Sequence, residues 1–463
     1  MEKKKKSSFT GSLGFVMAAA GSAVGVGNIW RFPYLVAQDG GGVFILVYLI
    51  LVLTFGFTLL TTDIAIGRRT KQNALRAFGT INPRWKFLGK LTFLVPALIM
   101  TYYSVIGGWV TKYITVYVTG QSAAAAQDGF FNSFISSPVS SIVFMLCFLA
   151  ATSVVVFFGV EKGIERFAKV VMPGLLFLII VIFGYAMTLE HTGADGVTRT
   201  GLEGLKVYLV PNFEGMSVGK FLKILLDAMS QLFFSLSVSM GIMITYGSYV
   251  KKEVNLTRSI RQIEFFDTSV ALLAGAMIVP TVYVFSGTEG MLSGPGLMFL
   301  SLPKVFDTMG GIGKVIGFAF FLMLGFAAVT SSVSIMETLV ANCMDIFHKG
   351  RKQMCAIIGV LSAASAVVIC LGYNVFYFEL PLPNGNTAQL LDLMDYVSNS
   401  LLMPLISFLT CLFVGWWVKP RWIEEEMMAS GHDFPRKGLY RVMIRYVAPV
   451  IMAILFFQSL GLI

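Results

Sequence analysis

Charged residues are scarce in this sequence. Asp, Glu, Lys and Arg make up 13% of its 463 residues, against roughly 25% in soluble domains. Hydrophobic residues make up 56%, and the mean hydropathy is +0.77. Apolar runs recur along the whole chain, each long enough to cross a hydrocarbon layer of about 30 Å. These features exclude a soluble globular protein and indicate an all-α polytopic membrane protein.

Histidine and cysteine are also rare, with three and five residues. The cysteines lie in or beside apolar runs without ligand spacing, so we expect neither disulfides nor a zinc site. There is no Walker A loop and no GxGxxG motif between a strand and a helix. We therefore expect no ATP-driven pump. We find no catalytic dyad that would face one cavity, and expect no enzyme.

The basic residues indicate the topology. A net charge of +10 would suit a nucleic-acid partner in a soluble protein, but here Lys and Arg fall in short loops, which set membrane orientation. We expect no nucleic-acid partner. The basic loops follow the second, sixth and eighth apolar runs, which predicts a cytoplasmic N-terminus. With an odd number of spans, the C-terminus is predicted to lie outside.

Eleven membrane spans are predicted. They cover residues 13–37, 43–67, 90–118, 138–158, 167–188, 222–248, 265–286, 314–340, 354–373, 391–417 and 440–462. The opening MEKKKKSSF and the apolar run after it resemble a signal peptide, but Asn28 and Arg31 interrupt the run and ten further spans follow. We therefore interpret it as an uncleaved first span.

The spans divide into two halves. We predict a cytoplasmic tail at 1–12, a first five-span repeat at 13–188, an extracellular loop at 189–221, a second five-span repeat at 222–417, a cytoplasmic loop at 418–439 and an eleventh span at 440–463. Because the chain stops with the last span, we expect no signalling or nucleotide-binding domain.

Two spans at corresponding positions of these halves contain helix breakers. The first holds GSAVGVGNIWRFPY, from Gly21 to Tyr34, and the sixth holds FFSLSVSMG, from Phe233 to Gly241. Paired interruptions of this kind are the best sequence indication of a transporter built from inverted repeats. Freed backbone at membrane depth is tolerated only where it lines a cavity or binds a ligand. The alternative is that small residues only permit close helix packing.

Several blocks carry a resemblance to a known family. They are LGFVMAAAGSAVGVGNIWRFPYLVAQDGGGVF, TYYSVIGGW, QLFFSLSVSMG, GPGLMFLSLPKVF, AAVTSSVSIME and LDLMD, in the expected order and spans. The chain resembles the neurotransmitter:sodium symporter family, whose bacterial members include eleven-span variants. This implies a leucine-transporter-type fold, a 5+5 inverted repeat with broken helices 1 and 6 plus an eleventh span. It also implies sodium-coupled symport of an amino acid across a bacterial inner membrane.

The resemblance implies two sodium sites. The matching positions are Ala23, Asn28, Ser235 and Asp267 for the first site, which the substrate carboxylate would complete, and Gly21, Val24, Ala327, Thr330 and Ser331 for the second. For Thr330 and Ser331, hydrogen bonding to their own helix carbonyls is the alternative.

Asp267 departs from the pattern of many animal members, which carry Asn there and use chloride. Ala271 lacks the hydroxyl that would help to hold that anion. A carboxylate inside the membrane is expensive and marks a functional site. We expect it to replace chloride, so no chloride requirement is predicted. Proton uptake by the same carboxylate on the return step is left open.

The resemblance also implies a substrate pocket. Gly25 stands where monoamine transporters carry an Asp, which favours an amino acid over an amine. Tyr103 matches the tyrosine that bonds the carboxylate, with plain packing as the alternative. Ser239 is expected to narrow the pocket and Met240 to let it repack, so the preferred size stays open. The expected lining is mostly apolar, which favours a neutral, hydrophobic or aromatic substrate: Ala23, Gly25, Gly27, Ile99, Tyr103, Phe234, Ser235, Ser237, Ser239, Met240, Ser331 and Ile335.

Gate residues follow from the same comparison. Arg31 and Asp395 match the outer pair, with a snorkelling arginine as the alternative for Arg31. At the inner face Asp345 is present, but Lys6 and Phe9 stand where the family has Arg and Trp. A weaker or water-mediated latch is expected, and the lysine could be only a topology signal.

Asp63 matches an acidic brace of the broken sixth span, and no role is assigned to Glu337. The alternative function is a non-transporting amino-acid sensor or a channel. We expect no required protein partner; a homodimer and the number of sodium ions per cycle are left open.

Overall fold

The computed structural model describes residues 8–193, 196–287, 290–291, 294–383 and 385–462. Within them the chain is almost entirely helical, and short π-helical or 3₁₀ segments are marked η. The first half contains α1 (Ser12–Ala23), α2 (Val26–Gln38), α3 (Gly42–Leu51), η1 (Val52–Gly56), α4 (Phe57–Thr70), α5 (Ala74–Ile81), η2 (Pro83–Trp85), α6 (Lys86–Val118), α7 (Ser122–Ala125), α8 (Phe130–Ser136), α9 (Pro138–Phe157), η3 (Val160–Glu165) and α10 (Arg166–Ala186).

The second half continues in the same manner. It contains α11 (Gly201–Leu209), α12 (Val218–Ser235), α13 (Ile242–Tyr249), α14 (Leu256–Ser286), η5 (Leu297–Ser301), α15 (Leu302–Thr308), α16 (Gly311–Phe347), α17 (Arg351–Leu371), α18 (Leu390–Asp395), η6 (Tyr396–Leu402), α19 (Met403–Leu412), η7 (Phe413–Val418), α20 (Arg421–Met427), α21 (Lys437–Val442), η8 (Met443–Val447) and α22 (Ala448–Ser459). Two small antiparallel hairpins pair β1 (Glu190–Thr192) with β2 (Thr198–Thr200) and β3 (Leu380–Pro381) with β4 (Thr387–Ala388).

Among the described residues, nine helices are long and apolar enough to cross a membrane, and the bent pair α1–α2 makes a tenth. The predicted sixth span appears as α12 and α13, which residues 236–241 separate. Several helices exceed their predicted bounds: α6 begins at Lys86 instead of 90, and α16 ends at Phe347 instead of 340. Hydropathy marks the apolar part of a helix, whereas backbone hydrogen bonding continues into the polar boundary.

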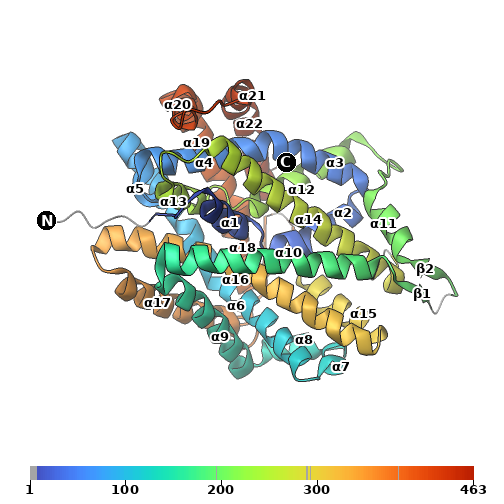
Figure 1. Ribbon diagram of the computed structural model, residues 1–463. Coiled ribbons are helices and arrows are strands. Elements are labelled where there is room, and N and C mark those ends of the chain that lie inside the picture. Colours follow the sequence, from blue (N-terminus) through green and yellow to red (C-terminus); the bar gives the residue numbers. More distant parts are fainter. Residues whose placement is uncertain (1–7, 194–195, 288–289, 292–293, 384, 463) are drawn as a thin grey trace.

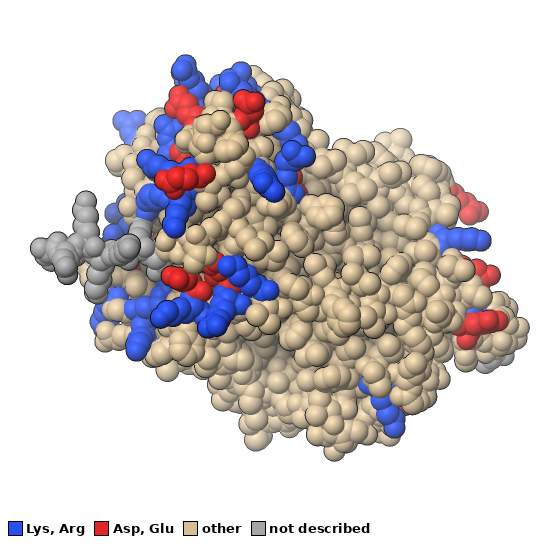
Figure 2. Space-filling model, in the orientation of Figure 1, with Lys and Arg blue, Asp and Glu red and all other residues tan. Residues whose placement is uncertain are grey.

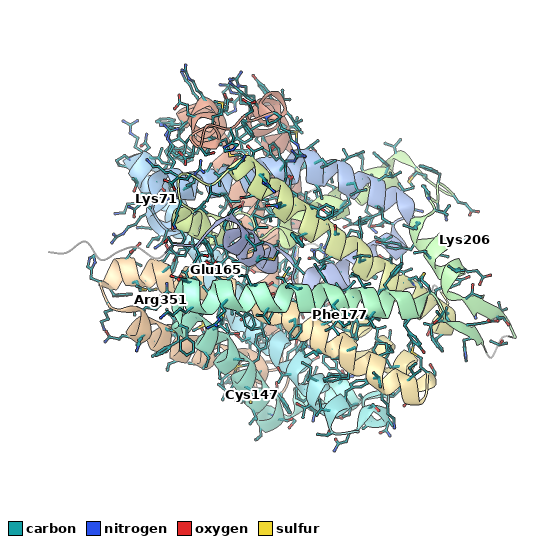
Figure 3. All side chains as sticks on the ribbon, viewed as in Figure 1. Lys71, Cys147, Glu165, Phe177, Lys206 and Arg351 are labelled. Carbon is teal, nitrogen blue, oxygen red and sulfur yellow. The ribbon has the colours of Figure 1, made fainter. Side chains whose placement is uncertain are left out.

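Charges gather at the two ends of the molecule. Figure 2 shows Lys, Arg, Asp and Glu at the end where the N-terminus lies and at the opposite end, with a nearly charge-free band between them. Figure 3 places Glu165 and Arg351 at the first end, Lys206 at the other, and Phe177 between them on α10. Phe177 is 66% exposed. This band has the character of a lipid-facing belt; we call the N-terminal end the inner end and the β1–β2 end the outer end.

The broken helices lie inside the bundle. α1 packs against α10, α14 and α16, while α13 packs against α4, as the central position of α1 in Figure 1 illustrates. At the α4–α13 contact, a Cβ on Gly67 would stand 1.9 Å from the Ile244 carbonyl oxygen, and one on Gly247 would stand 2.4 Å from the Ile64 oxygen. Only glycine permits this backbone approach, which fixes the inner half of the sixth span.

Candidate functional site

Both interrupted spans open their backbone at the centre of the molecule. α1 and α2 meet at a 52° bend, where Gly25 is extended at φ −113° and ψ −173°. In the second break, Ser237 and Ser239 have φ of +52° and +62°. Left-handed geometry in a non-glycine residue costs roughly 1–3 kcal/mol and persists where the surroundings enforce it, often at functional sites.

Asn28, Ser235 and Asp267 meet beside these breaks. Asn28 Nδ2 donates to Asp267 Oδ1 at 2.8 Å, and Ser235 Oγ lies 2.7 and 2.8 Å from the two carboxylate oxygens. All three residues are at most 1% exposed. In the described part of the chain, Asp267 makes no ion pair with Lys or Arg. A buried carboxylate requires a compensating charge, so this oxygen cluster suits a cation.

The second predicted sodium site lies between α1 and α16. A Cβ on Gly21 would stand 3.4 Å from Thr330 Cβ, and Ser331 Oγ donates to the Ser22 carbonyl at 3.1 Å. Thr330 Oγ1 lies 3.0 Å from both the Phe326 and Ala327 oxygens. The hydroxyl thus makes the alternative bond to its own helix. A hydroxyl has one donor and two acceptor lone pairs, so this bond leaves lone pairs available to a cation. The remaining members, Val24 and Ala327, are fully buried.

A small cavity lies beside the Asn28–Ser235–Asp267 cluster and the second predicted sodium site. Its volume of about 30 Å³ is close to that of one water molecule, so the site is contracted. The predicted substrate residues line it, except Gly27, Ser235 and Ser239. The lining residues are Ser22, Ala23, Gly25, Asn28, Ile99, Tyr103, Phe234, Ser237, Met240, Ile242, Ser331 and Ile335.

Tyr103 has an unusual hydroxyl in this cavity. The residue is 4% exposed, and its Oη makes no hydrogen bond of normal geometry to a described residue, although the Ser331 hydroxyl and the Val26 backbone are polar neighbours. This oxygen would lie 3.7 Å from a Cβ added at Gly25. A buried polar group without a partner is costly. The hydroxyl is thus available to a ligand at the helix break.

Three predicted pocket residues have other contacts. A Cβ on Gly27 would stand 2.3 Å from Phe234 Cδ1, so Gly27 accommodates that ring. Ser235 belongs to the carboxylate cluster. The expectation that Ser239 narrows the pocket is not met: its hydroxyl contacts Ser407 of α19, and its amide donates to Asp63 Oδ2 at 2.8 Å. The structure thus places Asp63 against the break in the sixth span.

A larger cavity lies on the outer side of Phe234, a residue that lines both cavities. Its volume is about 420 Å³, and Arg31 and Asp395 both line it. Arg31 Nη2 donates to Ser230 Oγ at 2.9 Å, while Asp395 Oδ1 accepts from Asn399 at 2.6 Å. Among the ion pairs of the described residues, none joins Arg31 to Asp395. Arg31 and Asp395, the predicted outer pair, thus line one cavity and bond to other residues, Ser230 and Asn399.

The inner side is closed by the N-terminal tail. Phe9 is 2% exposed, and its ring centroid lies 5.7 Å from that of Tyr246. The Thr10 amide donates to Glu165 Oε2 at 2.9 Å. Lys6 lies outside the described residues, and Asp345 accepts from Asn73 at 2.7 Å. The tail is thus held by an aromatic plug and Glu165, which sequence reasoning missed.

Glu337 occupies the centre of a second inner contact. Its two oxygens accept from Arg351 at 2.5 and 2.9 Å, and Oε1 also accepts from the Tyr249 hydroxyl at 2.7 Å. Glu337 is fully buried. The contact joins α13, α16 and α17. The acid inside a span was the available signal, but its partners were not apparent from sequence.

Comparisons with known proteins agree with this geometry. Residues 6–133 and 131–462 match the model of the sodium:neurotransmitter symporter family. The chain is similar to the sodium-dependent transporter YhdH of Bacillus subtilis (strain 168), 33% identical over 470 residues and 100% of both chains. It is 31% identical over 481 residues to a sodium-dependent transporter of Haemophilus influenzae, over 99% of each chain.

A solved structure is similar over nearly the same extent. The crystal structure of MhsT in complex with L-phenylalanine matches with a TM-score of 0.84 and 34% identity, covering 98% of this chain and 100% of that one. The predicted leucine-transporter-type fold is confirmed.

Proposed function

The chain belongs to the sodium:neurotransmitter symporter family, as a multi-pass, sodium-dependent symporter and not an enzyme, and we propose that it carries a neutral L-amino acid with sodium and without chloride. The observation that carries this proposal is the unpartnered Tyr103 hydroxyl beside Gly25, next to the Asn28–Ser235–Asp267 cluster. A donor, an open helix end and a cation site together fit an α-carboxylate.

The carboxylate is bound at the break in the first span. α2 begins at Val26, and its N-cap residue Gly25 has no side chain to cap the helix. Unpaired amides at a helix N-terminus attract an anion. Sodium at Asp267 adds a positive charge on the other side. Because the carboxylate and sodium compensate each other, each favours the binding of the other.

The side chain of the substrate is apolar. Ile99, Phe234, Met240, Ile242 and Ile335 line the cavity, and none can form an ion pair. The neighbouring MhsT structure holds L-phenylalanine, which supports a hydrophobic or aromatic substrate. The contracted cavity must expand, and the flexible Met240 is suited to repack.

Two sodium ions are proposed, one at Asp267 and one between Gly21 and Thr330. The fixed charge of Asp267 replaces chloride as the counter-charge, and Ala271, fully buried on the same helix, offers no hydroxyl to hold an anion. We place the chain in a bacterial inner membrane with the inner end, and so the N-terminus, in the cytoplasm. The basic loops at that end support this orientation.

Transport proceeds by alternating access. Substrate enters the outer cavity of about 420 Å³ and passes Phe234 to reach the small cavity. Arg31 and Asp395 then approach each other and close the outer side, since a guanidinium and a carboxylate bond strongly. Release requires the Phe9 plug and the Glu337–Arg351 contact to open. The separate inner and outer closures distinguish a transporter from a channel.

Replacing Tyr103 with phenylalanine is expected to weaken L-phenylalanine uptake by about ten- to a hundredfold in KM. A hydrogen bond to a charged group contributes about 1.5–3 kcal/mol. Folding stability should stay unchanged or rise, because the variant removes a buried group that lacks a partner. Uptake kinetics and the unfolding temperature in detergent measure the two effects. Met100→Leu, one turn away on α6, is the control, and an unchanged KM in Y103F contradicts the proposed carboxylate contact.

A further inference from the structure

A groove at the inner end carries an unusual charge pattern. Its volume is about 560 Å³, and it lies between α5, the start of α6 and the end of α16. We call it the basic groove. Among the described residues that line it three are cationic and none is acidic: Leu75, Arg76, Gly79, Thr80, Pro83, Lys86, Lys90 and Ile346.

The positive charge of the basic groove is not neutralised locally. Asp345, which precedes the lining residue Ile346, accepts a hydrogen bond from Asn73 at 2.7 Å, and Arg76 donates to its backbone oxygen. Lys86 and Lys90 make no ion pair in the described part of the chain. Spaced by four residues, they lie on one face of α6. They also stand in the first turns of a 33-residue helix, whose N-terminus adds positive potential.

The surroundings place the groove at the depth of lipid headgroups. The Trp85 ring lies 5.7 Å from Phe87 and 6.2 Å from Trp417, and Trp417 is 51% exposed. Tryptophans gather at membrane–water boundaries. On α6, Phe87 directly follows Lys86 and Leu94 stands one turn after Lys90, and these apolar side chains are 46% and 43% exposed. Cations at the boundary with apolar surface beside them match a phosphate joined to acyl chains.

We propose that the basic groove binds the phosphate of an anionic phospholipid from the membrane leaflet at the inner end. Arg76, Lys86 and Lys90 bond the phosphate, and the acyl chains lie along Phe87 and Leu94. Because Ile346 lines the groove, the bound lipid touches the end of α16. This proposal concerns lipid binding and does not depend on the transported substrate.

A second groove at the same end provides a matched comparison. It has a volume of about 940 Å³ and is lined by Arg258, Arg261 and Arg436, but also by Glu264 and Asp433. Arg436 and Glu264 form an ion pair at 3.2 Å. Its charge is therefore partly cancelled, and the basic groove is the stronger candidate for an anion.

The test measures phosphatidylglycerol and phosphatidylcholine bound to the purified protein after incubation with mixed micelles, by native mass spectrometry. The wild type is expected to retain phosphatidylglycerol preferentially. Each lysine near a membrane surface contributes about 1 kcal/mol, so K86Q/K90Q should lose about thirtyfold in affinity. R258Q/R261Q makes the same change in charge at the second groove and should retain the preference. K86R/K90R should retain it as well.

Each other outcome overturns the proposal. If the wild type retains both lipids equally, the groove does not select an anionic lipid. If K86Q/K90Q and R258Q/R261Q lose equal affinity for phosphatidylglycerol, the lipid is not held by the charge of the basic groove in particular. If K86R/K90R also loses affinity, the positive charge is not what binds the lipid. Displacement of phosphatidylglycerol by millimolar inorganic phosphate assigns the groove to a soluble anion instead of a lipid.

Discussion

Replacing Asp267 with asparagine is expected to raise the sodium concentration for half-maximal uptake by at least about a hundredfold. Asn28 and Ser235 donate to the carboxylate, and an amide oxygen can accept one of these bonds, so the substitution removes the charge and retains the shape. Two unit charges about 4 Å apart interact by about 4 kcal/mol at an effective dielectric constant of about 20. The initial rate of labelled L-phenylalanine uptake, measured against sodium concentration in proteoliposomes, gives the effect.

The neighbouring substitution Thr268→Val is the control, since it alters α14 at the next residue without changing charge. It should leave the sodium dependence unchanged. Replacing chloride by gluconate on both sides should leave wild-type uptake unchanged, because Asp267 supplies the negative charge. The account of the first sodium site is wrong if D267N keeps the wild-type sodium dependence, and chloride independence is wrong if gluconate removes most of the uptake.

Replacing Arg351 with glutamine is expected to destabilise the protein by about 3–5 kcal/mol. Glu337 is fully buried, and the variant leaves it with Tyr249 but without a cation. Removing one partner of a buried ion pair strands the other charge, and that cost has this size. In E337Q/R351Q both partners are neutral, so its stability should be closer to that of the wild type. Thermal unfolding in detergent compares the stability of the wild type, R351Q and E337Q/R351Q.

Arg421→Gln is the matched control for this effect. Arg421 pairs with Glu425 at 3.2 Å, but the two side chains are 84% and 48% exposed. Exposed pairs contribute about 0–1 kcal/mol, so this variant should unfold almost as the wild type does. If R351Q and R421Q were equally stable, the Glu337–Arg351 contact would not hold α16 and α17 together as described.

Much of the fold and part of the site were accessible from sequence. Glycines and serines inside apolar runs indicated both helix breaks. These residues weaken a helix, and lipid offers no hydrogen bonds to the backbone groups that a break exposes. Asn28, Ser235 and Asp267 are polar residues at membrane depth, where only a binding role or a satisfied contact is tolerated. The family resemblance assigned them to one site, and the structure brings their side chains within hydrogen-bond distance.

Other features depend on geometry that residue types do not encode. Ser239 adopts a left-handed φ of +62°, and its hydroxyl contacts Ser407 instead of lining the cavity. Glu337 was visible as a buried acid, but its partner Arg351 follows a turn and lies on the next helix. The Phe9 plug depends on how the tail folds back against Tyr246. Side-chain direction and long-range pairing therefore limit what the sequence predicts.

Uptake of labelled amino acids into proteoliposomes, with and without an inward sodium gradient, tests the central claim most directly. A panel of hydrophobic, aromatic, charged and decarboxylated compounds separates the proposed substrate class from its alternatives. We predict sodium-driven accumulation of neutral hydrophobic or aromatic L-amino acids and none of phenethylamine, which lacks the carboxylate. If no amino acid accumulates in a sodium-dependent manner, although sodium-dependent binding persists, the protein is a sensor and the account of transport is contradicted.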